Sequence, residues 1–291
     1  MIKIAESELI LTPEGKIYHL DLAPSQLADT VITVGDPGRV EMVSKYFDTI
    51  ETTAAHREFI THTGRYKGKR ISVISTGIGP DNIDIVFNEL DALVNIDFET
   101  RMIKDEKRSL RIIRIGTSGG LIPEVEVDKF LISTHGIGLD NVMYFYGQSE
   151  DVIDRQFSDA FKEHIGWNPR NSDPYVVQAD KDLVSLFQSE KTISGATITN
   201  VGFYGPQGRV LRLPLYDEEM NEKLASFSFH GHRITNLEME TSAMYGLAEL
   251  LGHQTVSLNA IIANRSTGTF SVDPKAAVDR LIQYALDKLV S

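Results

Sequence analysis

Two arginines stand beside glycine-rich segments that follow apolar, β-branched runs, and this arrangement is typical of a site for a small anion. Arg39 closes the stretch VITVGDPGR, and Arg114 lies in RIIRIGTSGG. A third such segment, STGIG, ends at Gly79. Glycines at strand ends let backbone N–H groups approach an anion, and the planar guanidinium fork matches the edge of a phosphate. Each segment alone is more typical of a tight turn, but three together indicate an anion site.

A sugar site is indicated by two acids in the stretch NLEMET. Glu238 and Glu240 occupy alternate positions where a strand is expected to meet a helix, so both face one side. Carboxylates accept paired hydrogen bonds, which suits the vicinal hydroxyls of a ribose. The same acids equally suit the start of a helix, where negative charge complements the helix dipole.

The stretch GFYGPQGRV combines groups that would bind a planar, polar base. Gln207 carries an amide that both donates and accepts hydrogen bonds, which suits a base with an N–H beside a carbonyl oxygen. Arg209 adds a charged donor, and Phe203 adds an aromatic face. A plain surface loop is the alternative. A further arginine, Arg265, follows an expected strand in ANRSTG.

Other common chemistries lack their sequence patterns. The dinucleotide pattern G-x-G-x-x-G fails at Gly77-Ile78-Gly79, which has no third glycine, and the P-loop pattern is absent. No G-x-S-x-G elbow and no histidine cluster with metal-ligand spacing occurs. The chain has no cysteine, which excludes disulfides and thiol nucleophiles. His19 lies in the apolar stretch IYHLDL. A single histidine in such a setting is more often a structural residue than a catalytic one.

The elements that must position these residues alternate between strands and helices. Alternation of this kind predicts a layered α/β domain, and no linker or repeat divides it, so residues 1–291 are expected to form one domain. Expected strands cover 31–35, a hairpin over 57–77 that turns near Lys67, and 111–115, 129–138, 196–204, 233–240 and 254–264. Expected helices cover 38–47, 82–94, 241–251 and 273–290, with Gly252 as a C-terminal cap. Residues 116–120 are expected to form a glycine-rich turn, and the charged stretch 95–110 a solvated helix end and loop.

The composition limits the partners of the protein. The formal net charge is -12, which argues against a broad nucleic-acid footprint. No apolar run approaches the roughly 18 residues of a membrane span, and the N-terminal stretch has acids where a signal peptide is basic. A cytoplasmic protein without membrane or nucleic-acid partners is expected.

Seven motifs in register resemble the uridine phosphorylase branch of the purine/uridine phosphorylase family. They are VGDPGRV, AHREF, STGIG, RIGTSGG, FYGPQGR, NLEMET and ANR, and the resemblance runs from IYHL to the final helix. It implies a three-layer α/β/α sandwich around a central mixed, partly barrel-like sheet. It also implies reversible phosphorolysis of uridine, deoxyuridine or thymidine to uracil or thymine and a pentose 1-phosphate. Inorganic phosphate would be a co-substrate, with no cofactor and no metal.

The resemblance implies a role for each site residue. Arg57 would reach the phosphate bound in a neighbouring subunit, and His19 would contact the 5′-hydroxyl of the nucleoside bound there. A homodimer is therefore implied as the minimal active unit, and a hexamer is the larger alternative. The residues implied to bind phosphate are Gly35, Arg39, Arg57, Arg114 and Thr117. Those implied to bind ribose are His19, Glu238, Met239 and Glu240. Those implied to bind the base are Phe203, Gln207, Arg209 and Arg265. Those implied to act directly in catalysis are Arg209, Gln207, Arg114 and Glu240.

Three alternatives remain open within this resemblance. Purine phosphorylases of the family carry a Ser-Asp pair, with the aspartate as proton donor, where this chain has Asn264-Arg265, which disfavours purines. Nucleosidases of the same fold use water and lack the full arginine set. A non-catalytic nucleoside-binding protein would be expected to lose some of the site residues. Relatives also hold a monovalent cation between subunits with a glutamate, matched by Glu58, and a serine, replaced here by Asn82, which leaves the cation site open.

Overall fold

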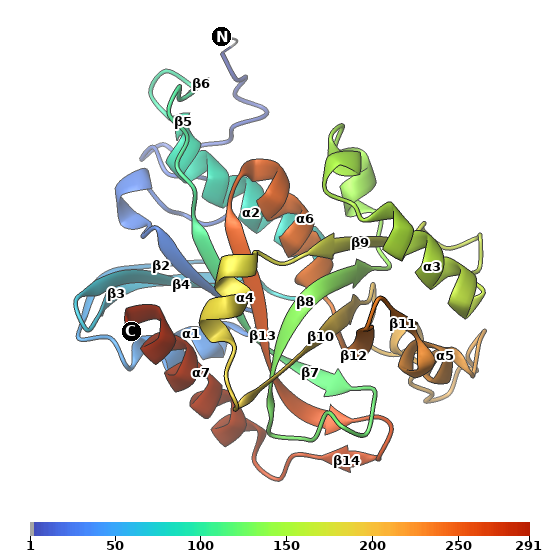
Figure 1. The fold of residues 1–291 in the computed structure, drawn as a ribbon. Coiled ribbons are helices and arrows are strands. Elements are labelled where there is room, and N and C mark those ends of the chain that lie inside the picture. The colour runs from blue at the N-terminus through green and yellow to red at the C-terminus, as the bar shows by residue number, and fades with distance from the viewer. Residues whose placement is uncertain (1–2) are drawn as a thin grey trace.

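In the computed structural model, which describes residues 3–291, a twelve-stranded mixed sheet runs through the molecule (Figure 1). Its central strands are apolar on both faces, as a sheet covered on two sides requires. In spatial order they are β12 (His232–Glu238), β10 (Thr192–Thr199), β8 (Phe130–Gly138), β13 (Gln254–Asn264), β7 (Arg111–Gly120), β1 (Thr30–Val34) and β4 (Lys69–Ser75).

Five further strands complete the sheet. The hairpin of β3 and β4 turns at Lys67-Gly68 as expected. These strands are β2 (Thr49–His56), β3 (Phe59–Tyr66), β9 (Tyr175–Gln178), β11 (Ser228–Phe229) and β14 (Thr269–Phe270), and β3 lies between β2 and β4. A separate two-stranded hairpin consists of β5 (Ile96–Asp97) and β6 (Met102–Ile103).

Helices cover both faces of the sheet (Figure 1), which confirms the expected α/β architecture. One face is covered by α2 (Pro80–Asn95) and α6 (Thr241–Leu251). The other is covered by α1 (Pro37–Ser44), α4 (Lys181–Phe187) and α7 (Pro274–Val290). A third apolar cluster includes α3 (Arg155–Ile165) and α5 (Met220–Ser226). Helix α6 ends at Gly252 in the left-handed conformation, as the sequence predicts.

Part of the sheet closes on itself. Strand β7 pairs with β13 on one side and, near its end, with β12, so β7, β13, β8, β10 and β12 form a closed ring. This closure is the expected barrel-like part of the sheet. It brings β7, which carries Arg114, close to the end of β12, which carries Glu238.

The structure corrects three expectations about local elements. The glycine-rich turn expected at residues 116–120 is wrong: these residues belong to β7, and Gly119 and Gly120 pair with β12. A Cβ on Gly120 would come within 2.9 Å of Val125 O, so glycine is needed there for close packing. The strand expected over 196–204 is shifted, since β10 ends at Thr199 and a loop follows. The stretch 95–110 is not only a helix end and loop, because it contains the β5–β6 hairpin.

Helices α3, α4 and α5 were not predicted from the sequence, although α3 and α4 begin with clear capping residues. Asp154 and Asp180 cap α3 and α4 by accepting hydrogen bonds from the N–H groups of Phe157 (3.0 Å) and Leu183 (2.8 Å). Helix α5, over residues 220–226, is short and has no side-chain cap, so its sequence gives little indication of a helix.

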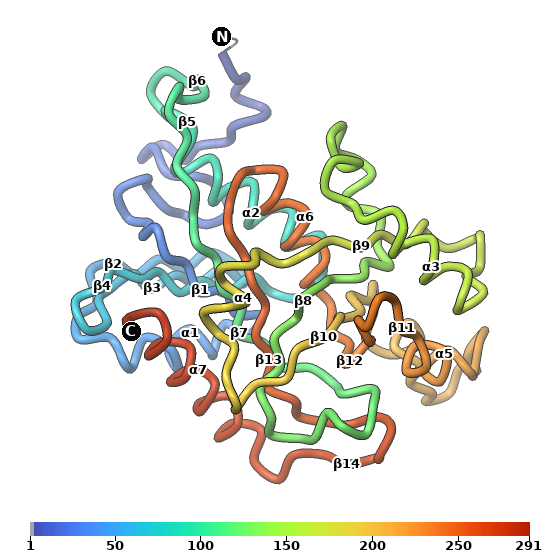
Figure 2. Tube along the Cα trace, in the orientation of Figure 1, coloured from blue at the N-terminus to red at the C-terminus, as the bar shows by residue number. Residues whose placement is uncertain are grey.

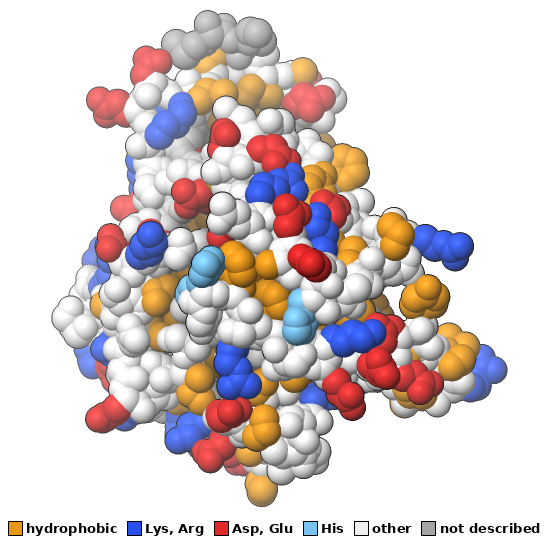
Figure 3. Space-filling model, turned by 45° about the vertical axis from the view of Figure 1, so that its right-hand side comes forward, with side chains coloured by type: hydrophobic (Ala, Val, Ile, Leu, Met, Phe, Trp, Pro, Cys, Tyr) orange, Lys and Arg blue, Asp and Glu red, His pale blue; other side chains and the backbone are white. Residues whose placement is uncertain are grey.

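The C-terminal helix α7 ends near strands from the N-terminal part of the chain. Helix α7 ends beside the β3–β4 hairpin (Figure 2), where Lys67 Nζ lies 2.7 Å from Asp287 Oδ1. Figure 3 shows acidic and basic side chains interspersed over one face, with no broad basic area on that face. Within residues 3–291, no helix has both the length and the apolar composition needed to cross a membrane.

Candidate active site

A cavity of about 630 Å³ lies at the carboxyl ends of β1, β4, β10 and β12, where α/β sheets commonly bind ligands. Ten of the thirteen residues proposed from the sequence line it. These ten are Gly35, Arg39, Arg114, Thr117, Phe203, Gln207, Arg209, Glu238, Met239 and Glu240. The cavity therefore unites the expected anion, sugar and base segments.

One end of the cavity is built around Arg39. Asp36 caps α1 by accepting a hydrogen bond from Gly38 N at 2.9 Å, and Pro37 occupies the first helical turn, so the helix start faces the cavity. Arg39 donates to the carbonyl oxygen of Ile115 at 3.1 Å and forms no ion pair within residues 3–291. Burial and the nearby charge of Arg114 lower the pKa of Arg39. A bound anion would stabilise the positive charge of Arg39 and so act against both of these effects.

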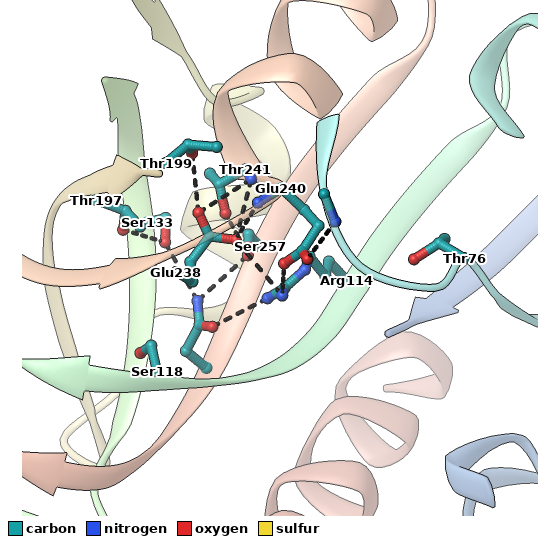
Figure 4. Close-up of polar contacts among 12 residues, drawn as sticks. Thr76, Arg114, Ser118, Ser133, Thr197, Thr199, Glu238, Glu240, Thr241 and Ser257 are labelled. Atoms are coloured by element: carbon teal, nitrogen blue, oxygen red, sulfur yellow. Dashed lines mark hydrogen bonds and ion pairs between the residues drawn. The ribbon is translucent and has the colours of Figure 1, made fainter. Parts of the chain in front are cut away.

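Arg114 is buried between two carboxylates (Figure 4). Its guanidinium donates to Glu240 Oε2 and to Asn259 Oδ1 (3.0 Å), and it lies 3.4 Å from Glu238 Oε2. Burial opposes the positive charge, but Glu240 and Glu238 outweigh burial and raise the pKa of Arg114. A Cβ at Gly116 would overlap the guanidinium, so glycine is needed there for this close approach.

Glu238 and Glu240 do different work although they are two residues apart. Glu238 accepts hydrogen bonds from the N–H groups of Glu240 (2.9 Å) and Thr241 (3.0 Å), which caps the start of α6. Burial raises the pKa of Glu238 to about 7, with Arg114 acting in the opposite direction. Glu240 accepts from Gly79 N at 3.0 Å and from Arg114, and it lines the cavity. Both sequence interpretations of these acids, helix start and ligand site, therefore apply.

The opposite end of the cavity holds the base segment. Arg209 lies over the ring of Phe203, 3.8 Å from its centroid, and donates to Phe203 O (2.7 Å) and to Gln207 Oε1. Because a guanidinium only donates, the amide oxygen of Gln207 faces Arg209, which leaves the amide NH₂ free for a carbonyl of a ligand. Burial and the charge of Arg265 lower the pKa of Arg209. Negative charge on a ligand would therefore be stabilised here.

Three of the proposed residues lie outside the cavity. Arg265 supports the base segment from behind, donating to the carbonyl oxygens of Gln207 (3.1 Å) and Gly208 (2.9 Å). Arg57 is exposed on the turn between β2 and β3. His19 is half-buried, and its Nδ1 lies 2.6 Å from Glu89 Oε1. His19 and the β2 end are neighbours, since His56 Nδ1 lies 3.3 Å from His19 O.

The sequence analysis missed residues that hold the site from behind. Asn259 on β13 fixes Arg114, and Thr199 at the end of β10 donates to Glu238 Oε1 at 2.9 Å. Ser118 lines the cavity within the segment expected to turn. None of them stood out in the sequence, where Thr199 lies inside the strand expected over 196–204. No group of three or more His, Asp or Glu side chains in residues 3–291 is arranged to hold a metal ion.

Comparison with known proteins gives a consistent family. The family model described as the phosphorylase superfamily matches residues 29–290. A uridine phosphorylase of Thermococcus kodakarensis is 29% identical over 280 residues, covering 92% of this chain and 84% of the relative. A purine nucleoside phosphorylase of Myxococcus xanthus is 25% identical over 276 residues, covering 92% and 95%.

Solved structures agree with this result. A nucleoside phosphorylase of Trypanosoma brucei, described as showing uridine phosphorylase activity, superposes with a TM-score of 0.88 at 31% identity, covering 97% of this chain and 99% of its own. A uridine phosphorylase of the oomycete Phytophthora capsici superposes with a TM-score of 0.70 at 22% identity, covering 100% and 99%. The second likeness bears on the fold alone.

Proposed function

The chain belongs to the phosphorylase superfamily, and from this premise we propose that it is a uridine phosphorylase, which cleaves uridine with inorganic phosphate to give uracil and ribose 1-phosphate. One observation carries the proposal: a single cavity holds an anion end at Arg39 and Arg114, and a base end at Gln207 and Arg209. Glu240 lines the same cavity and presents a carboxylate to the ribose hydroxyls.

The reaction follows from where charge develops. An oxygen of phosphate attacks C1′ of the ribose while the bond from C1′ to N1 of uracil breaks, and the electron pair leaves with the base. Positive charge on the ribose is offset by the phosphate dianion beside it. Negative charge on the base is stabilised by the preplaced donors of Arg209 and Gln207. The departing uracil then takes up one proton, which completes the exchange.

Asn264 and Arg265, which stand where the purine branch has its Ser-Asp pair, disfavour a purine substrate. The Nδ2 group of Asn264 donates to the carbonyl oxygens of Ile122 (2.9 Å) and Val125 (2.7 Å), and its Oδ1 accepts from the N–H of Ser266 at 2.9 Å. The side chain is buried and engaged with backbone groups. Arg265 donates to the carbonyl oxygens of Gln207 and Gly208 and keeps its protons, so neither residue is an acid that would protonate a departing purine.

A substrate panel tests the proposal directly. We expect uridine to release uracil only when phosphate is present, and ribose 1-phosphate to form in equal amount. Thymidine and 2′-deoxyuridine differ from uridine by one methyl and one hydroxyl and belong in the same panel, together with inosine. The measurement is base release followed by chromatography, with phosphate omitted in a parallel reaction.

The alternatives predict different results from this panel. Release at the same rate without phosphate would identify a nucleosidase. Inosine as the best substrate would identify a purine phosphorylase. Binding of uridine without release of uracil under any condition would identify a non-catalytic nucleoside-binding protein.

The proposal includes no cofactor and a homodimer as the active unit. Arg57 is exposed and follows His56, whose Nδ1 lies 3.3 Å from His19 O, and neither Arg57 nor His19 lines the cavity of its own chain, which supports a role at the cavity of a second subunit. Arg57 would add a third guanidinium to the phosphate, and His19 would meet the 5′-hydroxyl. A hexamer would contain the same dimer.

Mixing two inactive variants tests the shared site. We expect Arg57→Ala and Arg209→Ala to be nearly inactive alone, because each lacks one part of every site. A mixed dimer would contain one site with both residues intact, so co-refolding the two variants restores part of the activity. If the mixture stays as inactive as its components while forming dimers, Arg57 does not act across a subunit boundary.

A further inference from the structure

Behind the cavity, buried hydrogen bonds link the end of β10 to Glu238, and an ion pair links Glu238 to Arg114 (Figure 4). The backbone N–H of Ser242, in the first turn of α6, donates to Thr199 Oγ1 at 2.9 Å. Because that N–H occupies the hydroxyl oxygen as an acceptor, the hydroxyl proton of Thr199 is directed to Glu238 Oε1, also at 2.9 Å. Thr199 therefore has one fixed role in the chain, as donor to Glu238.

Glu238 has little capacity left for a ligand. Its two oxygens accept from Thr199 Oγ1 and from the N–H groups of Glu240 and Thr241, and Arg114 lies 3.4 Å from Oε2. These contacts approach the roughly four lone-pair directions of a carboxylate. The side chain of Glu238 is only 2% exposed. Glu238 thus holds Arg114 from behind, while Glu240 remains the carboxylate that faces the cavity.

We propose that Thr199 is a positioning residue for the phosphate-binding arginine: its hydroxyl holds and orients Glu238 so that Arg114 stays clamped between Glu238 and Glu240. The inference rests on the proposed phosphorolysis, in which Arg114 binds phosphate. It assigns a role to a residue that does not itself touch the substrates.

The charges around Glu238 set the sign of the effect. Arg114 of β7 favours its ionised form, whereas burial and Glu240 oppose it, and Tyr245 of α6 is the other titratable group that faces it. The hydrogen bond from Thr199 lowers the pKa of Glu238. Removing that bond raises the pKa, so Glu238 becomes neutral at a higher pH and releases its hold on Arg114.

The test compares Thr199→Val with Thr197→Val. Valine keeps the shape and removes the hydroxyl. Thr197 is a matched control, since it is buried on the same face of the same strand but bonds to Ser133 Oγ (2.6 Å) and Asn236 Oδ1 (2.7 Å), away from Glu238. Asn236 keeps a second hydroxyl contact from Thr235 in that control. Thr199→Ser restores the hydroxyl and serves as the rescue variant.

We expect Thr199→Val to raise the KM for phosphate about three- to tenfold, the range that one buried hydrogen bond supports, with a smaller change in the KM for uridine. The acidic limb of the kcat/KM profile for phosphate should move to higher pH. Thr199→Ser and Thr197→Val should keep the wild-type profile. If Thr199→Val does not fold, Thr199→Cys provides the same comparison, because a thiol donates only weakly.

Two results would overturn the inference: a Thr199→Val profile that matches Thr197→Val, or equal changes in both KM values without a pH shift. Each leaves phosphorolysis intact, because the wild-type enzyme still requires phosphate. Uracil release by the wild type without phosphate would instead contradict the proposed function. The two failures are therefore distinguishable in one set of assays.

Discussion

Arg209→Ala is expected to lower kcat/KM for uridine phosphorolysis by about 10²-fold or more, the usual cost of removing one preplaced donor from a developing anion. Arg209 lines the base end of the cavity beside Gln207, where the electron pair of the broken bond arrives. Burial and the charge of Arg265 lower the pKa of Arg209, which means that its positive charge is poorly compensated. Negative charge developing on uracil would compensate it. The loss should fall mainly on kcat, because the charge exists only as the bond breaks.

The control for this variant is Arg212→Ala. Arg212 lies in the same loop but is exposed and outside the cavity, so its removal should leave the kinetics unchanged. The melting temperature of both variants should stay near that of the wild type, since Arg209 bonds only within its own loop. Near-normal turnover by Arg209→Ala would show that another group stabilises the leaving base.

Arg39→Ala is expected to weaken phosphate use by about 10- to 100-fold, which corresponds to one lost charge-assisted hydrogen bond of about 1.5–3 kcal/mol. Arg39 has no carboxylate partner within residues 3–291, whereas Arg114 is paired with Glu240, so Arg39 brings a positive charge to the anion that no side chain balances. The loss should appear in the KM for phosphate, measured at saturating uridine. Arg39→Lys should recover only part of it, because an ammonium lacks the planar fork.

A different outcome would show that phosphate binds at the other end of the cavity. If Arg39→Ala raised the KM for uridine and left the KM for phosphate unchanged, the cavity would be occupied in the opposite direction. Folding is not expected to confuse the result, since Arg39 makes a single backbone hydrogen bond, to Ile115 O. The melting temperature of the variant checks this directly.

Local patterns in the sequence were sufficient for much of the site. Asp36, Pro37 and Arg39 lie within one helix start, and Gln207 and Arg209 within one loop, so residue type and spacing alone bring each set together. The alternation of strands and helices likewise predicts the layers of the fold. The base and anion segments could be joined only through the expectation that strand ends share one edge of a sheet.

What the sequence could not predict depends on contacts between distant strands. Arg114 and Glu240 are 126 positions apart, and their ion pair requires the ring closure between β7 and β12. The same closure explains why residues 116–120 continue a strand instead of turning. Glycine alone is ambiguous, since it serves tight turns and close strand approach equally well. Thr199 and Asn259 are ordinary strand residues until the fold places them behind Arg114.

The most direct test of a shared phosphate and pyrimidine site is a crystal structure with phosphate and a non-cleavable uridine analogue. We expect phosphate oxygens at about 3 Å from the guanidinium groups of Arg39 and Arg114. The carbonyl and N–H edge of the base should face Gln207 and Arg209, with the ribose hydroxyls at Glu240. Phosphate bound elsewhere, or a base turned with its apolar edge toward Gln207, would contradict the account.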